Sequence, residues 1–428
     1  MSFKISKILQ CILLIALASI FACSTDVDDA TNNIADDHVK IGILAPLTGP
    51  LAGFGRDMEN TARMAADEIN RVGGVNGKPI SFLVRDTRLG RSDSQTASLA
   101  MTNELINEGV VAIIGPAGSG TTLNIAPLAI ANGVLLITPS ATSPAISEID
   151  DSDLIWRTVA SDAFQGVFLA EQLVADGKNN IAVIYREDAY GIGLENSLVS
   201  AFQESGGTVL SSVGYPASKE NNFESEVESI FSQGTPDAIV IISFVIDGAN
   251  IMVSLANSSR TSVPDLYGVD GNNRDEFLEN SPRQLVLGMK GSAPTAPSTA
   301  PNYIAFSERF ENAFNAAPSV FTESTYDAVY LLASAMSVGR QNSTSALVQN
   351  LRPISLANTT SPLRINVGPE GYQQLLSNLD VDIDMVGAAS EIDFDNRGDV
   401  TSGNYIFWEV VEVDGQLTFR TIRESSFP

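Results

Sequence analysis

The feature that most constrains how this chain can fold is its alternation of short runs rich in β-branched residues with longer amphipathic stretches. In the longer stretches before Thr158, apolar residues recur at spacings of three and four, which is typical of helices packed on one side. The same succession starts again after Thr158. Repeated βαβ units build mainly parallel sheets covered by helices, so the sequence predicts an α/β protein with two lobes of like construction. The strands expected first are residues 39–45, 80–85, 110–114 and 134–138, and the helices among them are 56–71 and 93–107.

The N-terminus has the pattern of a targeting segment. Lys4 and Lys7 precede a largely apolar run over residues 8–22, and Cys23 follows it. A short positive region before an apolar run of this length is typical of a secretory signal. Residues 20–23 also resemble a bacterial lipobox, so we expect Cys23 to be lipidated and to begin the mature protein. An uncleaved transmembrane anchor, which needs about 20 apolar residues, and a cleaved signal without lipid are the alternatives.

The division of the N-terminal region follows from this pattern. Residues 1–22 are the expected lipoprotein signal peptide, and residues 23–38 are rich in Asp, Asn, Thr and Ala, as suits an acidic, solvated tether. The only other cysteine, Cys11, lies inside the signal, so the mature chain has no pair for an internal disulfide. Stability must come from core burial, and 428 residues that are 44% hydrophobic suffice for two cores of the usual size, up to about 250–300 residues each.

Charge and residue usage exclude several functions. The formal net charge is −26, and it becomes −28 once a signal that carries two lysines and no acid is removed. A surface this acidic repels phosphate backbones, so nucleic acid is not an expected partner. The only histidine is His38, at the end of the tether, which rules out Ser-His-Asp and Cys-His catalytic arrangements and Cys/His zinc sites in the mature fold. We therefore expect no enzyme, no cofactor and no metal.

Two loops after expected strands offer hydroxyl and backbone N–H groups. Ser119 and Gly120 stand between a strand and a helix, where the free N–H groups of the first helical turn favour an anion such as a carboxylate. Ser140, Ala141 and Thr142 end the next strand between two prolines, which can hold the hydroxyls rigidly toward the same anion. The alternative for Ser119 is that it only caps the helix.

Four further residues are candidates for the opposite side of a ligand site and for its walls. Tyr190 opens a helix, where its ring can stack on a ligand while its hydroxyl donates, or can simply pack on the surface of the lobe. Asp270 follows the expected strand 266–269, and its alternative role is to form the turn. Phe54 and Phe244 can form an apolar wall or belong to the core.

Several short segments, spread over nearly all of the chain from Val39 onward, carry a family resemblance. They are residues 41–50 (IGILAPLTGP), 53–55, 70–77, 114–120, 138–144, 157–166, 188–191 and 392–399. Taken together and in this order, they resemble the leucine/isoleucine/valine-binding proteins, which are type I periplasmic binding proteins.

The resemblance implies two αβα lobes with mainly parallel sheets, joined by three crossovers, with the ligand held in the cleft between them. Such clefts lie beyond the carboxyl ends of parallel strands. The crossovers are expected near residues 158–161, 288–292 and 399–405. Lobe 1 is then residues 39–158 plus 292–400, and lobe 2 is residues 159–291 plus 401–428.

The resemblance also implies a function and the roles of single residues. Ser119 and Thr142 match positions that bind the α-carboxylate of an amino acid, and an acid near Asp270 pairs with its ammonium group. Phe54 and Phe244 stand where relatives often carry a tyrosine or another polar-tipped aromatic, and this departure bears on which ligand fits. A member of this family delivers its ligand to the membrane permease of an ABC transporter from the periplasm or cell envelope, here with a lipid on Cys23 as the membrane anchor. A ligand-binding sensor or a regulatory lipoprotein of the same fold is the alternative.

Overall fold

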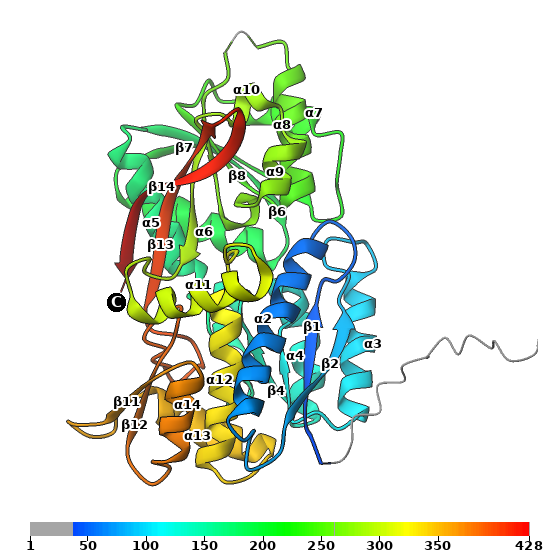
Figure 1. The fold of residues 1–428 in the computed structure, drawn as a ribbon. Coiled ribbons are helices and arrows are strands. Elements are labelled where there is room, and N and C mark those ends of the chain that lie inside the picture. The colour runs from blue at the N-terminus through cyan, green and yellow to red at the C-terminus, as the bar shows by residue number, and fades with distance from the viewer. Residues whose placement is uncertain (1–36, 261, 428) are drawn as a thin grey trace, which may run out of the picture. The chain divides into compact units, whose positions relative to one another are not determined.

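The computed structural model describes residues 37–260 and 262–427. The expected signal peptide, Cys23 and nearly all of the tether therefore lie outside the described residues. In the described part, two large sheets define two lobes, which Figure 1 shows one above the other.

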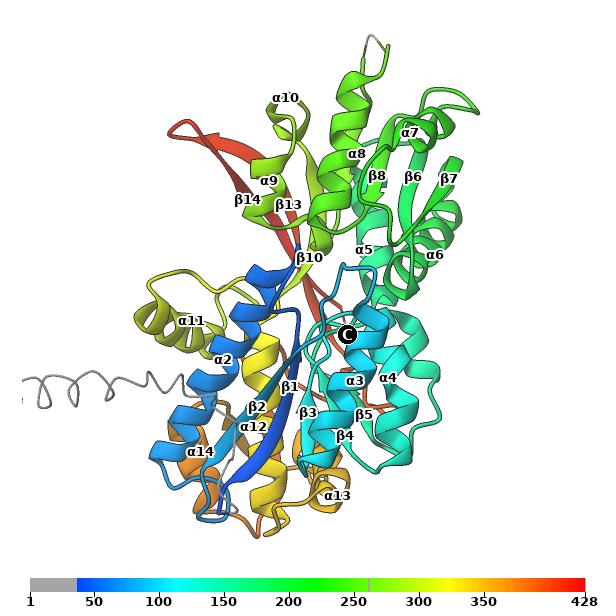
Figure 2. The same ribbon diagram turned by 90° about the vertical axis from the view of Figure 1, so that its right-hand side faces the viewer.

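Lobe 1 is built on a five-stranded sheet in the order β2-β1-β3-β4-β5, in which every neighbouring pair is parallel. Helices α2 and α12 cover one face, and α3 and α4 lie on the other (Figure 2). The bounds are β1 Val39–Ala45, β2 Ile80–Asp86, β3 Ala112–Ile114, β4 Leu135–Thr138, β5 Ile155–Arg157, α2 Ala52–Arg71, α3 Ser94–Asn107, α4 Ser119–Ala131 and the 3₁₀ turn η1 Pro144–Glu148.

A later part of the chain completes lobe 1. Helix α12 is buried along nearly its whole length, as expected for a helix that is covered on all sides. It is fixed to α2 by the hydroxyls of Tyr326 and Tyr330, which donate to the buried carboxylate of Glu68 at 2.5 and 2.8 Å. The bounds of this part are α11 Pro301–Phe314, α12 Thr322–Val338, α13 Thr344–Ser355, β11 Leu363–Asn366, α14 Pro369–Leu376 and β12 Ile383–Val386.

Lobe 2 is built on a seven-stranded sheet in the order β14-β13-β10-β9-β8-β6-β7. The strands from β10 to β7 are parallel, and a C-terminal antiparallel hairpin, β13 and β14, extends the sheet at β10. Asp414 and Gly415, a dipeptide typical of tight hairpin turns, join them with positive φ at both residues, as a type I′ turn requires. The bounds are α5 Asp162–Ala175, β6 Asn180–Glu187, α6 Ala189–Glu204, β7 Thr208–Pro216, α7 Glu224–Ile230, β8 Ala238–Ile242, α8 Val245–Asn257, β9 Asp265–Gly268, η2 Asp270–Asn272, α9 Asp275–Asn280, α10 Arg283–Val286, β10 Lys290–Thr295, β13 Gly403–Val413 and β14 Gln416–Phe427.

The chain passes between the two sheets three times: between β5 and α5, after β10, and before β13. The second passage lies further along the chain than the sequence suggested. Strand β10 stays in the sheet of lobe 2 up to Thr295, because Ser292 to Thr295 continue to pair with β13. The expected boundary between residues 291 and 292 therefore falls inside a strand, and lobe 1 resumes only after Thr295.

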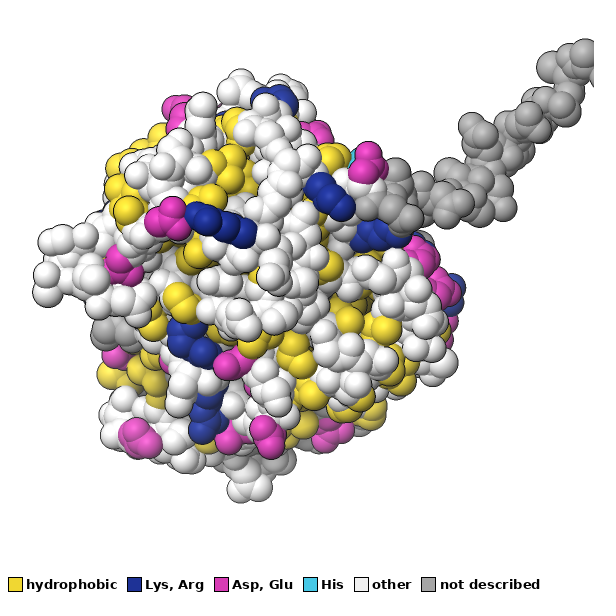
Figure 3. All heavy atoms as spheres, turned by 90° about the horizontal axis from the view of Figure 1, so that it is seen from below, with side chains coloured by type: hydrophobic (Ala, Val, Ile, Leu, Met, Phe, Trp, Pro, Cys, Tyr) yellow, Lys and Arg dark blue, Asp and Glu magenta, His cyan; other side chains and the backbone are white. Residues whose placement is uncertain are grey.

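No helix within residues 37–260 and 262–427 is both long and apolar enough to cross a membrane. On the face shown in Figure 3, basic side chains are separated by acidic, apolar and other polar ones. This distribution fits the net charge of −26.

Candidate functional site

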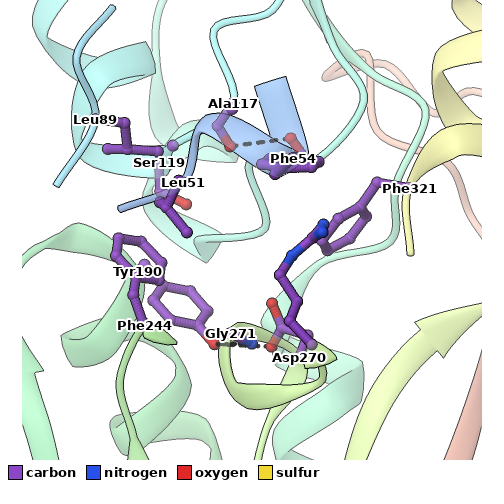
Figure 4. A pocket seen from close by; sticks show the side chains of 13 residues that line it. Leu51, Phe54, Leu89, Ala117, Ser119, Tyr190, Phe244, Asp270, Gly271 and Phe321 are labelled. Atoms are coloured by element: carbon purple, nitrogen blue, oxygen red, sulfur yellow. Dashed lines mark hydrogen bonds between the residues drawn. The ribbon is translucent and has the colours of Figure 1, made fainter. Parts of the chain in front are cut away.

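A cavity lies where the two lobes meet, and both lobes line it (Figure 4). About 460 Å³ of space lies between the atoms of its lining, a figure that includes space open to solvent. We call it the cleft cavity. Lobe 1 contributes Leu51, Phe54, Leu89, Ala117, Gly118, Ser119, Ser140 and Phe321, and lobe 2 contributes Tyr190, Phe244, Asp270, Gly271 and Arg274.

The lining residues follow the carboxyl ends of parallel strands in both lobes. Ser119 and Ser140 come after β3 and β4, while Tyr190, Phe244 and Asp270 come after β6, β8 and β9. In each sheet, successive strands are added first on one side and then on the other. This change falls between β1 and β3 in lobe 1 and between β6 and β8 in lobe 2, next to these strand ends. Ligand sites of open α/β sheets are found at this place.

Lobe 1 presents hydrogen-bond donors to the cavity. Ser119 is the first residue of α4, so the N–H groups of that turn have no carbonyl partner within the helix. The Ser119 hydroxyl oxygen accepts from the Ser143 N–H at 3.1 Å, which leaves its proton for another acceptor. The Ser140 hydroxyl donates to the Ala117 carbonyl at 3.0 Å (Figure 4). The two serines therefore lie on one wall beside a helix start that is suited to an anion.

Arg157 holds the loop after β4 in place. This residue is fully buried and donates to the carbonyls of Thr142 and Ser143 at 3.0 and 2.9 Å. It also forms a two-point ion pair with Asp399, at 2.5 and 2.8 Å, where the chain approaches its third passage between the lobes. Such a planar, charge-assisted pair is geometrically specific. The position of the loop is thus coupled to the passages between the lobes.

Lobe 2 presents a stack of aromatic rings. Tyr190 and Phe244 lie face to face, with centroids 5.5 Å apart and planes inclined by 11° (Figure 4). The Arg186 guanidinium covers Phe244 at 3.9 Å from its centroid and is paired with Asp188 and Asp247, both at 2.6 Å. This stack fixes the Tyr190 ring at the edge of the cavity.

Asp270 provides the buried carboxylate of the cavity. Its Oδ1 accepts from the Tyr190 hydroxyl at 2.8 Å and from the Gln165 amide at 2.9 Å. Burial raises the pKa of Asp270 above its ordinary value, although these two hydrogen bonds oppose the rise. No cationic side chain in the described part of the chain lies within 4 Å of Asp270 in an ion pair. A cation placed here would stabilise the ionised form.

A second buried carboxylate, that of Asp162, lies behind this wall at the start of α5. It is fully buried, and neither of its oxygens has a hydrogen-bond partner of ordinary geometry. Burial, and next the charge of Asp270, hold the pKa of Asp162 well above its usual range. This shift favours the protonated form of Asp162, and burial raises the pKa of Asp270 in the same direction.

The remaining wall combines two phenyl rings with a guanidinium. Phe54 and Phe321 of lobe 1 lie with centroids 5.8 Å apart (Figure 4). The Arg274 guanidinium of lobe 2 lies 4.6 Å from the centroid of Phe54. This wall is the only part of the described lining with a basic side chain.

The structure brings most of the predicted site residues to one cavity. Gly120 lines an adjoining hollow on the side of Leu89 and Arg186 rather than the cavity itself. Ala141 and Thr142 are buried and do not line the cavity, because the Thr142 backbone turns toward Arg157 and the start of α5. The predicted residues that do line it are Phe54, Ser119, Ser140, Tyr190, Phe244 and Asp270.

Sequence reasoning missed several lining residues. Arg274 follows Asp270 by four positions, so its charge next to a candidate acid was a readable signal. Phe321 gave no signal, since it lies 267 positions after Phe54 and reaches the cavity only because α12 packs on α2. Within the described residues, no group of three or more His, Cys, Asp or Glu side chains is placed to hold a metal ion.

The fold and the cavity define a class of protein. Two lobes of parallel sheets joined by three passages, with a cavity lined from both at the strand ends, have the architecture of a type I periplasmic binding protein. A sequence profile described as periplasmic binding protein matches residues 38–369. The chain belongs to this family.

Curated relatives and solved structures agree with this assignment. A leucine-, isoleucine-, valine-, threonine- and alanine-binding protein of Pseudomonas aeruginosa is 32% identical over 191 residues, 44% of this chain and 50% of that protein. The chain thus matches about half of the length of this relative. A leucine-specific-binding protein of Salmonella typhimurium is 26% identical over 330 residues, 77% of this chain and 86% of that protein.

The solved structures bear on the fold alone. A leucine-binding protein, LivK, of Thermotoga maritima has a TM-score of 0.73 at 24% identity, and the match covers 89% of this chain and 97% of that one. A LivJ protein of Streptococcus pneumoniae in complex with isoleucine has a TM-score of 0.71 at 20% identity, covering 90% and 99%.

Proposed function

We propose that this protein is an extracytoplasmic solute-binding lipoprotein that captures an amino acid in the cleft cavity and delivers it to the permease of an ABC transporter. One observation carries the proposal. Ser119, whose hydroxyl proton is not donated within the described part of the protein, and the first N–H groups of α4 line the cavity from lobe 1, and the carboxylate of Asp270 lines it from lobe 2. The cavity therefore offers donors for an anion on one side and an acceptor for a cation on the other, which is the complement of a zwitterion.

The charge of Asp270 argues for a ligand with an ammonium group. Asp270 is 7% exposed, and the hydrogen bonds from Tyr190 and Gln165 fix the direction of its carboxylate. A purely anionic or neutral ligand would close the cavity over an unpaired charge, which is costly. An ammonium group that pairs with Asp270 removes this cost, while the α-carboxylate takes the start of α4. Thr142 keeps its proposed role at the carboxylate only if closure turns its hydroxyl toward the ligand.

The relatives support the ligand class by what their names state. The Pseudomonas aeruginosa protein binds leucine, isoleucine, valine, threonine and alanine, and a Desulfitobacterium hafniense protein was solved in complex with leucine. We assign the anchor to a lipid on Cys23, on the strength of the lipobox resemblance of residues 20–23. The protein then works in the periplasm or cell envelope, tethered to the membrane by residues 23–38.

A sensor is the second candidate. A chemotactic signal transduction substrate-binding protein, BasB, of Halobacterium salinarum is 26% identical over 313 residues, 68% of this chain and 71% of that protein. The same capture of a ligand would then report to a membrane partner instead of feeding a permease. Deletion of the protein would abolish uptake of labelled ligand in the first case, and only the behavioural response in the second.

A thermal-shift screen of the mature protein tests the capture itself. A ligand that binds only the native state raises Tm, because it increases the free energy of unfolding by about 2.7 kcal/mol at a ligand concentration of 100 times its Kd. The screen compares the common amino acids with their deaminated acids and with aromatic acids such as 4-hydroxybenzoate, which is bound by a Rhodopseudomonas palustris protein of this fold. Amino acids should raise Tm. A response to the deaminated or aromatic acids alone would refute the proposal.

A further inference from the structure

Arg274 stands at the boundary of the cleft cavity with its hydrogen-bonding capacity unused. Its side chain is 12% exposed and lines both the cleft cavity and a larger hollow, whose lining also includes Arg56 and Asp57. A guanidinium carries five N–H donors. Within the described residues, none of these donors forms a hydrogen bond, and the nearest acid, Asp57, is 3.9 Å away from Nη1. This distance is beyond hydrogen-bonding range.

The contacts that Arg274 makes are with a ring and with a carboxylate beyond hydrogen-bonding range, and neither takes its donors. Its guanidinium lies over the Phe54 ring at 4.6 Å, which supports one face of the group. The Asp57 carboxylate is engaged elsewhere, because it accepts from the Ser319 hydroxyl at 2.6 Å. Asp57 therefore offsets the charge of Arg274 without taking its donors.

Arg274 remains charged in this setting. Burial lowers the pKa of the guanidinium, but the charges of Asp57, Glu276 and Asp270 oppose the shift, and an arginine side chain does not lose its proton in proteins. Its nitrogens remain within reach of solvent, so an acceptor on a ligand would replace water at these donors. A planar carboxylate fits the guanidinium with two parallel hydrogen bonds.

The α-groups of an amino acid leave its side chain facing one of two walls. With the α-carboxylate at Ser119 and the ammonium at Asp270, one wall is apolar and includes Leu51 and Leu89, and the other is formed by Phe54, Phe321 and Arg274. Of these two walls, the second carries the unused donors of Arg274. The rings can flank methylene groups, and Arg274 stands beyond them. We infer that the cleft takes an amino acid whose side chain ends in a second carboxylate, and that Arg274 binds this carboxylate. This inference rests on the proposed capture of an amino acid.

A purely mechanical role for Arg274 makes a different prediction. Because Phe54 and Asp57 belong to lobe 1 and Arg274 to lobe 2, the contact could serve only to hold the lobes together. Loss of such a contact between the lobes weakens the binding of every ligand by the same factor. Loss of a carboxylate-binding group weakens acidic amino acids and spares neutral ones. The ratio of affinities is therefore the measurement that decides.

The experiment is titration calorimetry of the full mature protein with glutamate, aspartate, glutamine and leucine. Glutamate and glutamine have nearly the same shape and differ in charge. We expect an acidic amino acid to bind about 30-fold or more tightly than its amide, as for a buried charge pair. Arg274→Met, which keeps a long side chain on Phe54, should remove this preference while leucine and glutamine change by less than about three-fold.

Two further variants control the result. Arg274→Lys keeps the positive charge but loses the planar guanidinium that can form two parallel hydrogen bonds. This variant should retain part of the preference for acidic amino acids. Arg56→Met removes an exposed arginine that lines the larger hollow but not the cleft cavity, and it should change nothing. Equal weakening of all ligands by Arg274→Met, or wild type that prefers leucine, would overturn the inference while the proposed function stands. If no amino acid binds, the proposed function fails and the inference fails with it.

Discussion

Replacing Asp270 by Asn should separate what this residue does for the ligand from what it costs the empty protein. The substitution keeps the shape of the side chain and leaves an amide oxygen to accept from Tyr190 and Gln165, which now lie 2.8 and 2.9 Å from Oδ1. It removes only the charge, from a residue that is 7% exposed. Ligand affinity and stability should therefore move in opposite directions.

The expected loss of affinity follows from the burial of the pair. Truncating one partner of a desolvated charge pair costs about 2–5 kcal/mol, which is roughly 30-fold to several thousand-fold in Kd. If Asp270 only forms the turn before Asn272, the loss is below about 1 kcal/mol, as for an ordinary surface substitution.

The expected gain in stability follows from the pKa. Burial raises the pKa of Asp270 in the folded protein, so its contribution is favourable at low pH and is lost as the pH rises above the unfolded value of about 4. Without ligand, Asp270→Asn should therefore have a higher Tm than wild type at pH 7–8, and the difference should vanish near pH 4.

Calorimetry with an amino acid and its deaminated acid, together with melting curves of the empty protein, tests both halves. Asp275→Asn is a matched control, since Asp275 is exposed at the start of α9 and does not line the cleft cavity. Unchanged affinity in Asp270→Asn, or wild type that binds the deaminated acid as well as the amino acid, would refute the ammonium assignment.

Three more predictions concern other parts of the molecule. Burial raises the pKa of Glu323 in α12 to about 7, so the contribution of this residue to stability is lost between about pH 4.5 and 7. In chemical denaturation, Glu323→Gln should therefore be more stable than wild type by up to about 3 kcal/mol at pH 8 and equally stable at pH 4. A larger difference at pH 4 than at pH 8 would contradict this. Small-angle scattering should give a smaller radius of gyration with saturating ligand, because ligand groups divided between two lobes come together by closure; identical curves would count against a hinge. Cys23→Ala should leave a folded but unlipidated protein, and mass spectrometry that finds an unmodified Cys23 in the native protein would exclude the anchor.

The sequence was sufficient for everything that depends on local pattern. Apolar periodicity placed β1 at residues 39–45 and the C-terminal ends of α2 and α3, because a strand or an amphipathic helix repeats its contacts within a few residues. The positive φ that Asp414 and Gly415 adopt was foreseeable for the same reason. Ser119, Tyr190 and Asp270 were identifiable because each lies near the start of a helix or turn that follows a strand, and the carboxyl ends of parallel strands meet at one edge.

Only the tertiary structure decided which of these residues share a surface. The length of β10 was set by its pairing with β13, more than a hundred residues later, so local propensity could not end it at residue 292. Thr142 was drawn away from the cavity by Arg157, while Phe321 and Arg274 were brought to it from separate lobes by the packing of α12 on α2 and by the turn after Asp270. The sequence specifies periodic contacts between near neighbours, but the wall that faces a ligand's side chain is made by contacts between residues far apart in the chain, and these exist only once both lobes have folded.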